Sequence, residues 1–105
     1  MKEISVQELK AWQDAQADFQ LIDVREDYEY EQANLGGLHI PMATIGNNVA
    51  QIAKDKKVVV HCRSGKRSAT VIRMLEQSFR LDNLYNLQGG ILAYAAEIDD
   101  SLDVN

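Results

Sequence analysis

The feature that most constrains the fold of this chain is an unbroken β-branched run, Val58-Val59-Val60, within the segment Lys57–His61. A strand with one face in water alternates apolar and polar residues, whereas this run contains no polar side chain. Such a strand is typical of a parallel sheet that helices cover on both faces. In sheets of this kind, ligands bind beyond the carboxyl ends of the strands. The residues directly after His61 are therefore the first place to look for a functional site.

Short strands and helices alternate along the rest of the chain. Further strands are expected over Lys2–Ile4, Phe19–Val24, Leu38–Ile40 and Leu84–Leu87. Helices are expected after a capping box formed by Ser5 and Glu8, over Glu26–Gln32, through Ile45, Val49 and Ile52, from Ser68 to about Ser78, and through Ile91, Ala95 and Ile98. This alternation predicts an α/β fold with a mostly parallel central sheet flanked by helices on both faces.

Composition and charge limit the domain count and the kinds of partner. The chain has 105 residues and shows no internal repeat, low-complexity block or Pro/Gly-rich linker, so one domain over residues 1–105 is expected. The net charge of −5 argues against nucleic acid and anionic membrane as partners, because binding to phosphates depends on Lys and Arg. Much of the acid lies near the C-terminus, where residues 97–105 are expected to form a solvated tail.

The compartment is predicted from the N-terminus and the cysteine count. No apolar run approaches the ~20 residues that span a bilayer. The first residues carry no apolar segment typical of a signal peptide. The single cysteine, Cys62, cannot form an internal disulfide, and a lone thiol suits a reducing compartment. A cytoplasmic protein is therefore expected.

The loop Cys62-Arg63-Ser64-Gly65-Lys66-Arg67 combines a thiol with features that stabilise negative charge. It precedes a helix, whose positive end favours a thiolate, and three cationic side chains lie nearby. Gly65 can adopt positive φ, so that a tight loop can turn its backbone N–H groups inward as an anion cradle. We expect an acidic, nucleophilic Cys62 in a cradle for an oxyanion or a persulfide sulfur. Ser68, which follows, is expected to cap the helix.

The sequence resembles the rhodanese family at four places in the family's order. Cys62–Arg67 is similar to the family's six-residue active loop, and Leu21–Glu26 (Leu-Ile-Asp-Val-Arg-Glu) resembles its first marker. Tyr28 and Glu31 stand where an aromatic and an acid often follow that marker. The other two similarities are Leu38–Ala43 (Leu-His-Ile-Pro-Met-Ala) and Leu87–Ile91 (Leu-Gln-Gly-Gly-Ile).

The resemblance implies a sulfurtransferase with a rhodanese-like fold. Cys62 would be the nucleophile that accepts sulfur as a persulfide. The backbone of Arg63, Ser64, Gly65, Lys66 and Arg67 would form the substrate-binding cradle. The three cationic side chains would attract a small anionic donor such as thiosulfate, and the acceptor would be a thiol, cyanide or a protein persulfide. No metal or organic cofactor is implied, because the cysteine sulfur is itself the carrier.

Two other functions remain open at this point. A cysteine phosphatase uses a similar loop, but only four residues separate Cys62 from Arg67, where the phosphatase pattern has five. The shorter loop favours a single sulfur over a tetrahedral phosphate. A non-enzymatic sulfur-relay or docking module would need the same loop, so the sequence does not separate it from a free-standing enzyme.

Four polar residues outside the loop are expected to be structural. Asp23 and Arg25 are interpreted as a polar pair, since Cys62 needs no general base if the loop already ionises it. His61 ends a buried strand and is expected to be packed and hydrogen-bonded. His39, which lies in a turn before Pro41, is expected to have a structural role.

Overall fold

Five parallel strands form the central sheet of the computed structural model, which describes residues 1–104. The strands are β1 (Lys2–Ile4), β2 (Phe19–Asp23), β3 (Leu38–His39), β4 (Lys57–His61) and β5 (Leu84–Leu87). Their spatial order is β1-β5-β4-β2-β3, which puts β4 at the centre of the sheet. The predicted α/β fold with a parallel sheet is confirmed.

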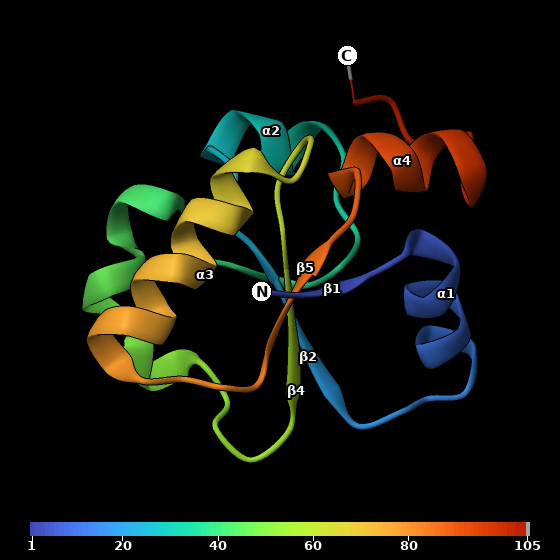
Figure 1. The fold of residues 1–105 in the computed structure, drawn as a ribbon. Coiled ribbons are helices and arrows are strands. Elements are labelled where there is room, and N and C mark those ends of the chain that lie inside the picture. Colours follow the sequence, from blue (N-terminus) through green and yellow to red (C-terminus); the bar gives the residue numbers. More distant parts are fainter. Residues whose placement is uncertain (105) are drawn as a thin grey trace.

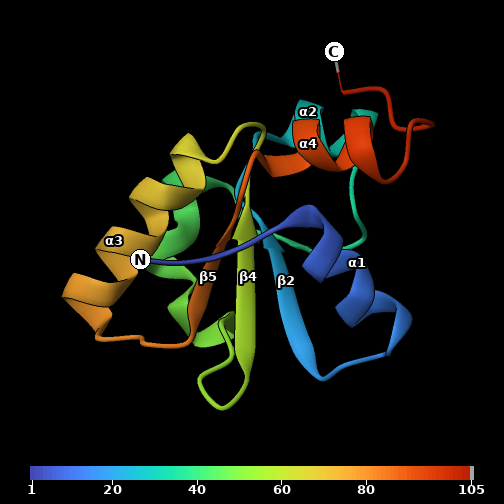
Figure 2. The ribbon, with the colours of Figure 1, turned by 45° about the vertical axis from the view of Figure 1, so that its right-hand side comes forward.

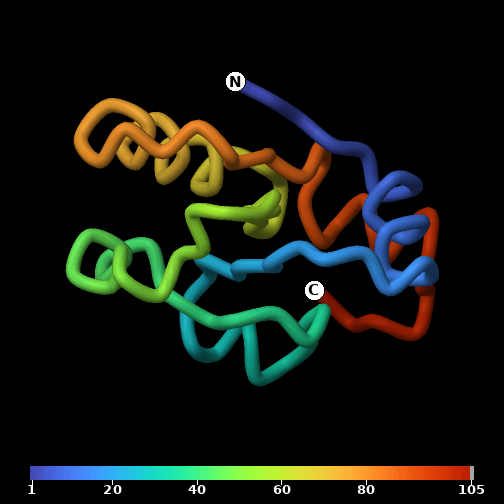
Figure 3. The backbone as a smooth tube through the Cα atoms, turned by 90° about the horizontal axis from the view of Figure 1, so that it is seen from below, coloured from blue at the N-terminus to red at the C-terminus, as the bar shows by residue number. Residues whose placement is uncertain are grey.

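Helices cover both faces of this sheet. They are α1 (Val6–Asp14), α2 (Asp27–Gln32), α3 (Lys66–Phe79) and α4 (Gly90–Glu97), with the 3-10 helices η1 (Met42–Asn47) and η2 (Val49–Gln51). Figure 1 shows α3 and the 3-10 helices on one face and α1 with α4 on the other. Figure 3, seen from below, shows the same three layers with the strands in the middle. The short helix α2 lies at the end of the sheet where β2 and β4 finish (Figure 2).

The β-branched run of β4 contributes to a separate apolar cluster on each face of the sheet. Val58 and Val60 belong to the cluster that includes Ile72 and Leu75 of α3. Val59, between them, belongs to the cluster formed with α1 and α4. Successive side chains of a strand point to opposite faces, so a strand covered on both sides needs apolar residues at every position. This explains the absence of polar alternation in the sequence.

Several element boundaries differ from the sequence prediction. Strand β2 ends at Asp23, one residue earlier than expected, and Ile45, Val49 and Ile52 lie on and beside two short 3-10 helices instead of one α-helix. The capping box of α1 is present: the Ser5 side chain accepts a hydrogen bond from the backbone of Glu8, whose side chain accepts from the backbone of Ser5.

The helix that follows the cysteine loop begins earlier than predicted. Helix α3 starts at Lys66, and Gly65, with a φ of 103°, occupies the capping position. Ser68 is therefore the third residue of the helix and not its N-cap, so that expectation was wrong. The left-handed backbone of Gly65 turns the chain into the helix without a side-chain cap, which releases the Ser68 hydroxyl for other contacts.

The segment after α4 packs on the domain. The acidic side chains of Glu97, Asp99 and Asp103 are exposed. Ile98 and Leu102, four residues apart, are half-buried against the cluster formed with α1 and α4. The expectation of a solvated tail is therefore wrong for the apolar side chains, because their burial holds the chain against the protein. Asn105 lies outside the described residues.

Candidate active site

The loop Cys62–Arg67 connects β4 to α3 at the carboxyl edge of the sheet. Cys62 follows the last residue of β4, and β4 pairs with β2 so that His61 lies beside Asp23. The first turn of α4 and the helix α2 reach the same edge (Figures 1 and 2). The loop is thus enclosed by segments that are distant in the sequence.

Hydrogen-bond donors converge on the sulfur of Cys62. The backbone N–H of Gly65 donates to Sγ at 3.1 Å, and the backbone N–H of Ser68 donates at 3.4 Å. The Ser68 hydroxyl lies 3.4 Å from the same sulfur. These donors come from a left-handed glycine and from the first turn of a helix, where N–H groups have no partner within the helix. Of the residues expected to form the cradle, Gly65 contacts the sulfur, and Ser68, which lies outside the expected Arg63–Arg67 range, supplies the other contacts.

These contacts lower the pKa of the Cys62 thiol. Burial is the largest influence and raises the pKa, since the residue is only 1% exposed. The opposing influences, in order, are the hydrogen bond with the Ser68 side chain and those from the backbone of Ser68, Gly65 and Ser64, and together they prevail. The net shift is downward from the ordinary value, so the surroundings favour the thiolate.

The start of α4 holds the backbone of the loop from the other side. Ile91 donates its backbone N–H to the carbonyl of Cys62 at 2.9 Å, and Leu92 donates to the carbonyl of Arg63 at 3.1 Å. Gly90, with a φ of 60°, lies so close that a Cβ there would be 2.3 Å from the Arg63 oxygen. The Gly-Gly marker therefore permits a close approach that orients the loop carbonyls toward α4.

Asn86 is a site residue that sequence reasoning missed. Its Oδ1 accepts a hydrogen bond from the Ser68 hydroxyl at 2.6 Å, and its Nδ2 donates to the Gly65 carbonyl at 3.1 Å. Asn86 is buried in β5. The signal in the sequence was a lone amide in the otherwise apolar and aromatic segment Leu84–Leu87. Buried amides need hydrogen-bond partners, and this one finds them in the loop.

The three cations of the loop have different surroundings. Arg67 forms a bidentate ion pair with Glu29 of α2, at 2.7 and 2.9 Å. Arg63 donates to the backbone carbonyl of Val104 in the C-terminal segment. Lys66 is exposed. The expectation that all three side chains draw in an anion needs correction for Arg67, whose guanidinium is directed to a carboxylate.

Glu29 is the second site residue that sequence reasoning missed. Its pKa is lowered to about 2, first by the hydrogen bonds from Arg67, against the opposing effect of burial. The resemblance pointed to Tyr28 and Glu31 on this helix, but both are exposed. Their neighbours make the contacts instead: Glu29 pairs with Arg67, and Tyr30 stacks on His39 with ring centroids 4.5 Å apart. Successive residues of a short helix point in different directions. The spacing of Tyr28 and Glu31 from the first marker did not show which residues of the helix face the loop.

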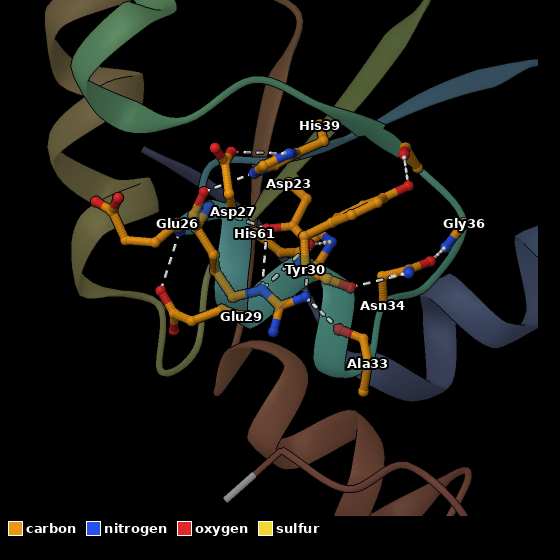
Figure 4. A network of polar contacts seen from close by, with 12 residues as sticks. Asp23, Glu26, Asp27, Glu29, Tyr30, Ala33, Asn34, Gly36, His39 and His61 are labelled. Atoms are coloured by element: carbon orange, nitrogen blue, oxygen red, sulfur yellow. Dashed lines mark hydrogen bonds and ion pairs between the residues drawn. The ribbon is translucent and has the colours of Figure 1, made fainter.

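A network of buried polar side chains, which includes Asp23, lies beside the end of β4 that leads into the loop (Figure 4). Arg25 donates from Nη2 to Asp23 Oδ2 at 2.7 Å and to the Ala33 carbonyl at 2.7 Å, and both charged side chains are almost fully buried. This geometry agrees with the interpretation of Asp23 and Arg25 as a structural pair. His39 supports it, with Nε2 2.7 Å from the Arg25 carbonyl.

His61 is packed as predicted but is not hydrogen-bonded. Neither ring nitrogen has a hydrogen-bond partner among the described residues, and Nε2 is 3.8 Å from Asp23 Oδ2. Burial lowers its pKa to about 4, against the attraction of Asp23 for a proton. The position at the centre of a sheet covered on both faces removes His61 from water, so the ring is held neutral.

A cleft of about 240 Å³ lies beside the loop, and its lining comes from α2, the loop and the C-terminal segment. The residues that line it are Arg25, Tyr28, Glu29, Gln32, Arg63 and Val104. Within residues 1–104, no group of three or more His, Cys, Asp and Glu side chains is arranged to hold a metal ion. None of the helices over the same residues has the length and apolar character needed to cross a bilayer.

Comparison with known proteins agrees with this geometry. The profile of the rhodanese-like domain family matches residues 5–97. The chain is 39% identical to the putative sulfurtransferase YtwF of Bacillus subtilis, over 92% of the chain and 93% of that protein. It is 31% identical to the probable adenylyltransferase/sulfurtransferase MoeZ of Mycobacterium tuberculosis, over 94% of the chain but only 26% of that protein.

Solved structures give the same result. The crystal structure of a rhodanese-like domain protein from Staphylococcus aureus superposes with a TM-score of 0.83 at 31% identity, over 100% of this chain and 99% of that one. The profile match, the similarity to proteins named sulfurtransferases and the shared fold all include the loop at Cys62. The chain belongs to the rhodanese-like domain family.

Proposed function

We propose that the protein is a sulfurtransferase that carries a sulfane sulfur as a persulfide on Cys62. The observation that carries the proposal is the convergence of the Gly65 and Ser68 donors on the Cys62 sulfur. Donors arranged in advance around a sulfur stabilise negative charge there without reorganisation during the reaction. They suit both the attacking thiolate and the persulfide anion that replaces it.

The reaction has two displacement steps. The Cys62 thiolate attacks the sulfane sulfur of the donor, the new S–S bond forms as the donor's own bond breaks, and the electron pair leaves with the donor fragment, such as sulfite from thiosulfate. An acceptor then attacks the outer sulfur, and the electron pair of the broken S–S bond returns to Cys62 as thiolate. Neither step needs a general base when the thiol is already ionised. No metal or organic cofactor takes part in this scheme.

Substrates reach the sulfur only after neighbouring groups move aside. Cys62 is 1% exposed, so a donor cannot contact Sγ unless neighbouring side chains move. The cleft between α2 and Arg63 is the proposed binding site for a small anionic donor before it reacts. Candidate acceptors are a thiol, cyanide or a protein persulfide, and Arg63–Arg67 is the proposed binding loop.

A relay to a partner protein is the second candidate function. The observation that favours it is the similarity to MoeZ, which is named as an adenylyltransferase as well as a sulfurtransferase and of which this chain spans about a quarter. A sulfurtransferase region that is part of a larger protein can deliver sulfur to a protein acceptor instead of a small molecule. Both functions use the same Cys62 persulfide, and they differ in the acceptor.

A phosphatase is less well supported. Phosphoryl transfer needs cationic groups directed at the phosphate oxygens. The only arginine at the end of the loop, Arg67, is instead paired with Glu29. We expect hydrolysis of an aryl phosphate to be far slower than sulfur transfer, and the reverse ranking would favour the phosphatase.

The experiment is to load reduced protein with thiosulfate, remove the donor and measure the intact mass. The expected gain is one sulfur atom, lost on addition of cyanide with release of thiocyanate, and absent from Cys62→Ser. Refusal of thiosulfate together with loading from a protein persulfide would favour the relay. The proposal would be contradicted if folded protein with a free thiol took up no measurable sulfur from thiosulfate, polysulfide or persulfide donors.

A further inference from the structure

The ion pair between Glu29 and Arg67 is anchored on the Glu29 side. Glu29 Oε1 accepts from Arg67 and also from the backbone N–H of Glu26, at 3.0 Å. The Glu29 side chain is 13% exposed and that of Arg67 is 33% exposed, so the carboxylate is the more buried partner. Glu29 is held by the cap of its own helix, α2 (Figure 4), and its carboxylate pairs with Arg67 of the loop. Arg67 is therefore drawn toward α2 by a partner with little freedom to move.

The pair changes the charge that the loop presents to a substrate. Arg67 directly precedes Ser68, whose N–H donates to the Cys62 sulfur. An unpaired guanidinium there would add a full positive charge to the surroundings of the sulfur. Bound to Glu29, it forms a pair with no net charge, whose field falls off faster than that of a single cation. Glu29 also lines the cleft beside the loop, together with Arg63.

We propose that Glu29 sets the donor preference of Cys62 by compensating Arg67. The inference rests on the proposed sulfurtransferase function. With the charge of Arg67 compensated by Glu29, the site attracts a dianionic oxyanion donor such as thiosulfate less strongly than it would if Arg67 had no carboxylate partner. Donors of lower charge, such as a thiosulfonate or a persulfide, lose less from the missing attraction. Glu29 lines the cleft, but in this proposal it acts by compensating the charge of Arg67, so it is a positioning residue.

Thiosulfate and methanethiosulfonate provide a matched pair of donors. In both cases the Cys62 thiolate attacks the sulfane sulfur, the donor S–S bond breaks, and the electron pair leaves with sulfite or methanesulfinate. Thiosulfate carries two negative charges and methanethiosulfonate carries one. The ratio of kcat/KM for the two donors, with cyanide as acceptor, therefore reports the charge near the sulfur. A folding defect lowers both values and leaves the ratio unchanged.

The test variant is Glu29→Gln, which keeps an oxygen for the Glu26 N–H because glutamine serves in the same cap position. We expect the ratio of thiosulfate to methanethiosulfonate to rise about 3- to 10-fold, because one uncompensated positive charge near the sulfur attracts the dianion more strongly than the monoanion. The thiosulfate reaction should also become more sensitive to ionic strength. The control is Glu31→Gln, an exposed residue of the same helix, which changes net charge equally and should alter the ratio less than about twofold.

The double variant Glu29→Gln/Arg67→Gln completes the test. With both charges removed, the ratio should return to within about twofold of the wild-type value. Normal loading by both donors with an unchanged ratio in Glu29→Gln would overturn the donor preference alone. Failure of every variant and the wild type to form an adduct on Cys62 with either donor would overturn the proposed function, and this inference with it.

Discussion

Asn86 Oδ1 accepts a hydrogen bond from the Ser68 hydroxyl at 2.6 Å, and the same hydroxyl lies 3.4 Å from the sulfur of Cys62. A serine hydroxyl has one proton to donate, so it can serve Asn86 or the sulfur, but not both at once. With the neutral thiol, the proton bonds to Asn86 and the S–H can donate to Ser68. With the thiolate, the hydroxyl can rotate toward the sulfur and stabilise its charge.

Ser68→Ala should raise the pKa of the Cys62 thiol, because the Ser68 side chain is the largest of the influences that lower it. The backbone N–H of residue 68 remains, so the rise is partial. The rate of alkylation by a small reagent, measured against pH, reports the thiolate. Thr70→Ala is the control, since it removes an exposed hydroxyl from the same helix. An alkylation profile of Ser68→Ala identical to the wild type would show that the hydroxyl does not stabilise the thiolate.

Gly90→Ala should destabilise the protein and abolish sulfur loading. A Cβ at this position would lie 2.3 Å from the Arg63 oxygen and 2.6 Å from the Cys62 oxygen, and φ is positive at 60°. The strained backbone costs about 1–3 kcal/mol, and the overlap with the loop adds to it. Urea denaturation measures the change. Gly46→Ala, where nothing lies within 4 Å of the added atom, should cost less than 1 kcal/mol, roughly that of an ordinary surface change.

Stability should fall as the pH is lowered from about 6.5 toward 4, because of His61. Burial lowers its folded-state pKa from 6.5 to about 4, so the unfolded chain takes up a proton in this range while the folded protein does not. The stability is fully present above pH 6.5, and the loss is on the order of 3 kcal/mol once the pH reaches 4.

Urea midpoints of wild type and His61→Gln between pH 7 and 4 test this expectation. The variant should show a shallower slope, even if it is less stable at pH 7. Glu29 also loses part of its stabilisation in this range, since its pKa is 4.5 in the unfolded chain and about 2 in the folded protein, but both proteins contain Glu29 and its contribution cancels in the comparison. Equal slopes for the two proteins would mean that His61 does not control stability in this range.

Arg25→Leu should destabilise the protein strongly, by about 3–5 kcal/mol, because it leaves the buried charge of Asp23 without its partner. Lys in place of Arg25 should rescue little, since one ammonium cannot reproduce the forked bonds to Asp23 and the bond to the Ala33 carbonyl. Thermal unfolding gives the measurement. Lys10→Leu, which breaks the exposed pair with Asp14, is the control and should change stability little. A similar effect of both substitutions would argue against a structural role for the buried pair.

The amino-acid sequence alone was enough to predict the fold class, the family and the place of Cys62 directly after a buried central strand. These follow from local patterns: an unbroken β-branched run specifies a strand covered on both faces, and a glycine after a cysteine permits a tight turn of N–H groups. The same local logic placed Ser68 at the helix cap, which was wrong because Gly65 already turned the chain into α3.

Only the tertiary structure decided which distant groups contact the loop. Arg67 pairs with Glu29, which is 38 residues away, and Ser68 bonds to Asn86, which is 18 residues away. An arginine has five N–H donors on a flexible stem and can face a sulfur cradle or a carboxylate equally well from its place in the sequence. The choice depends on where α2 and β5 pack, and that packing results from burial of apolar side chains throughout the domain, which no local pattern encodes.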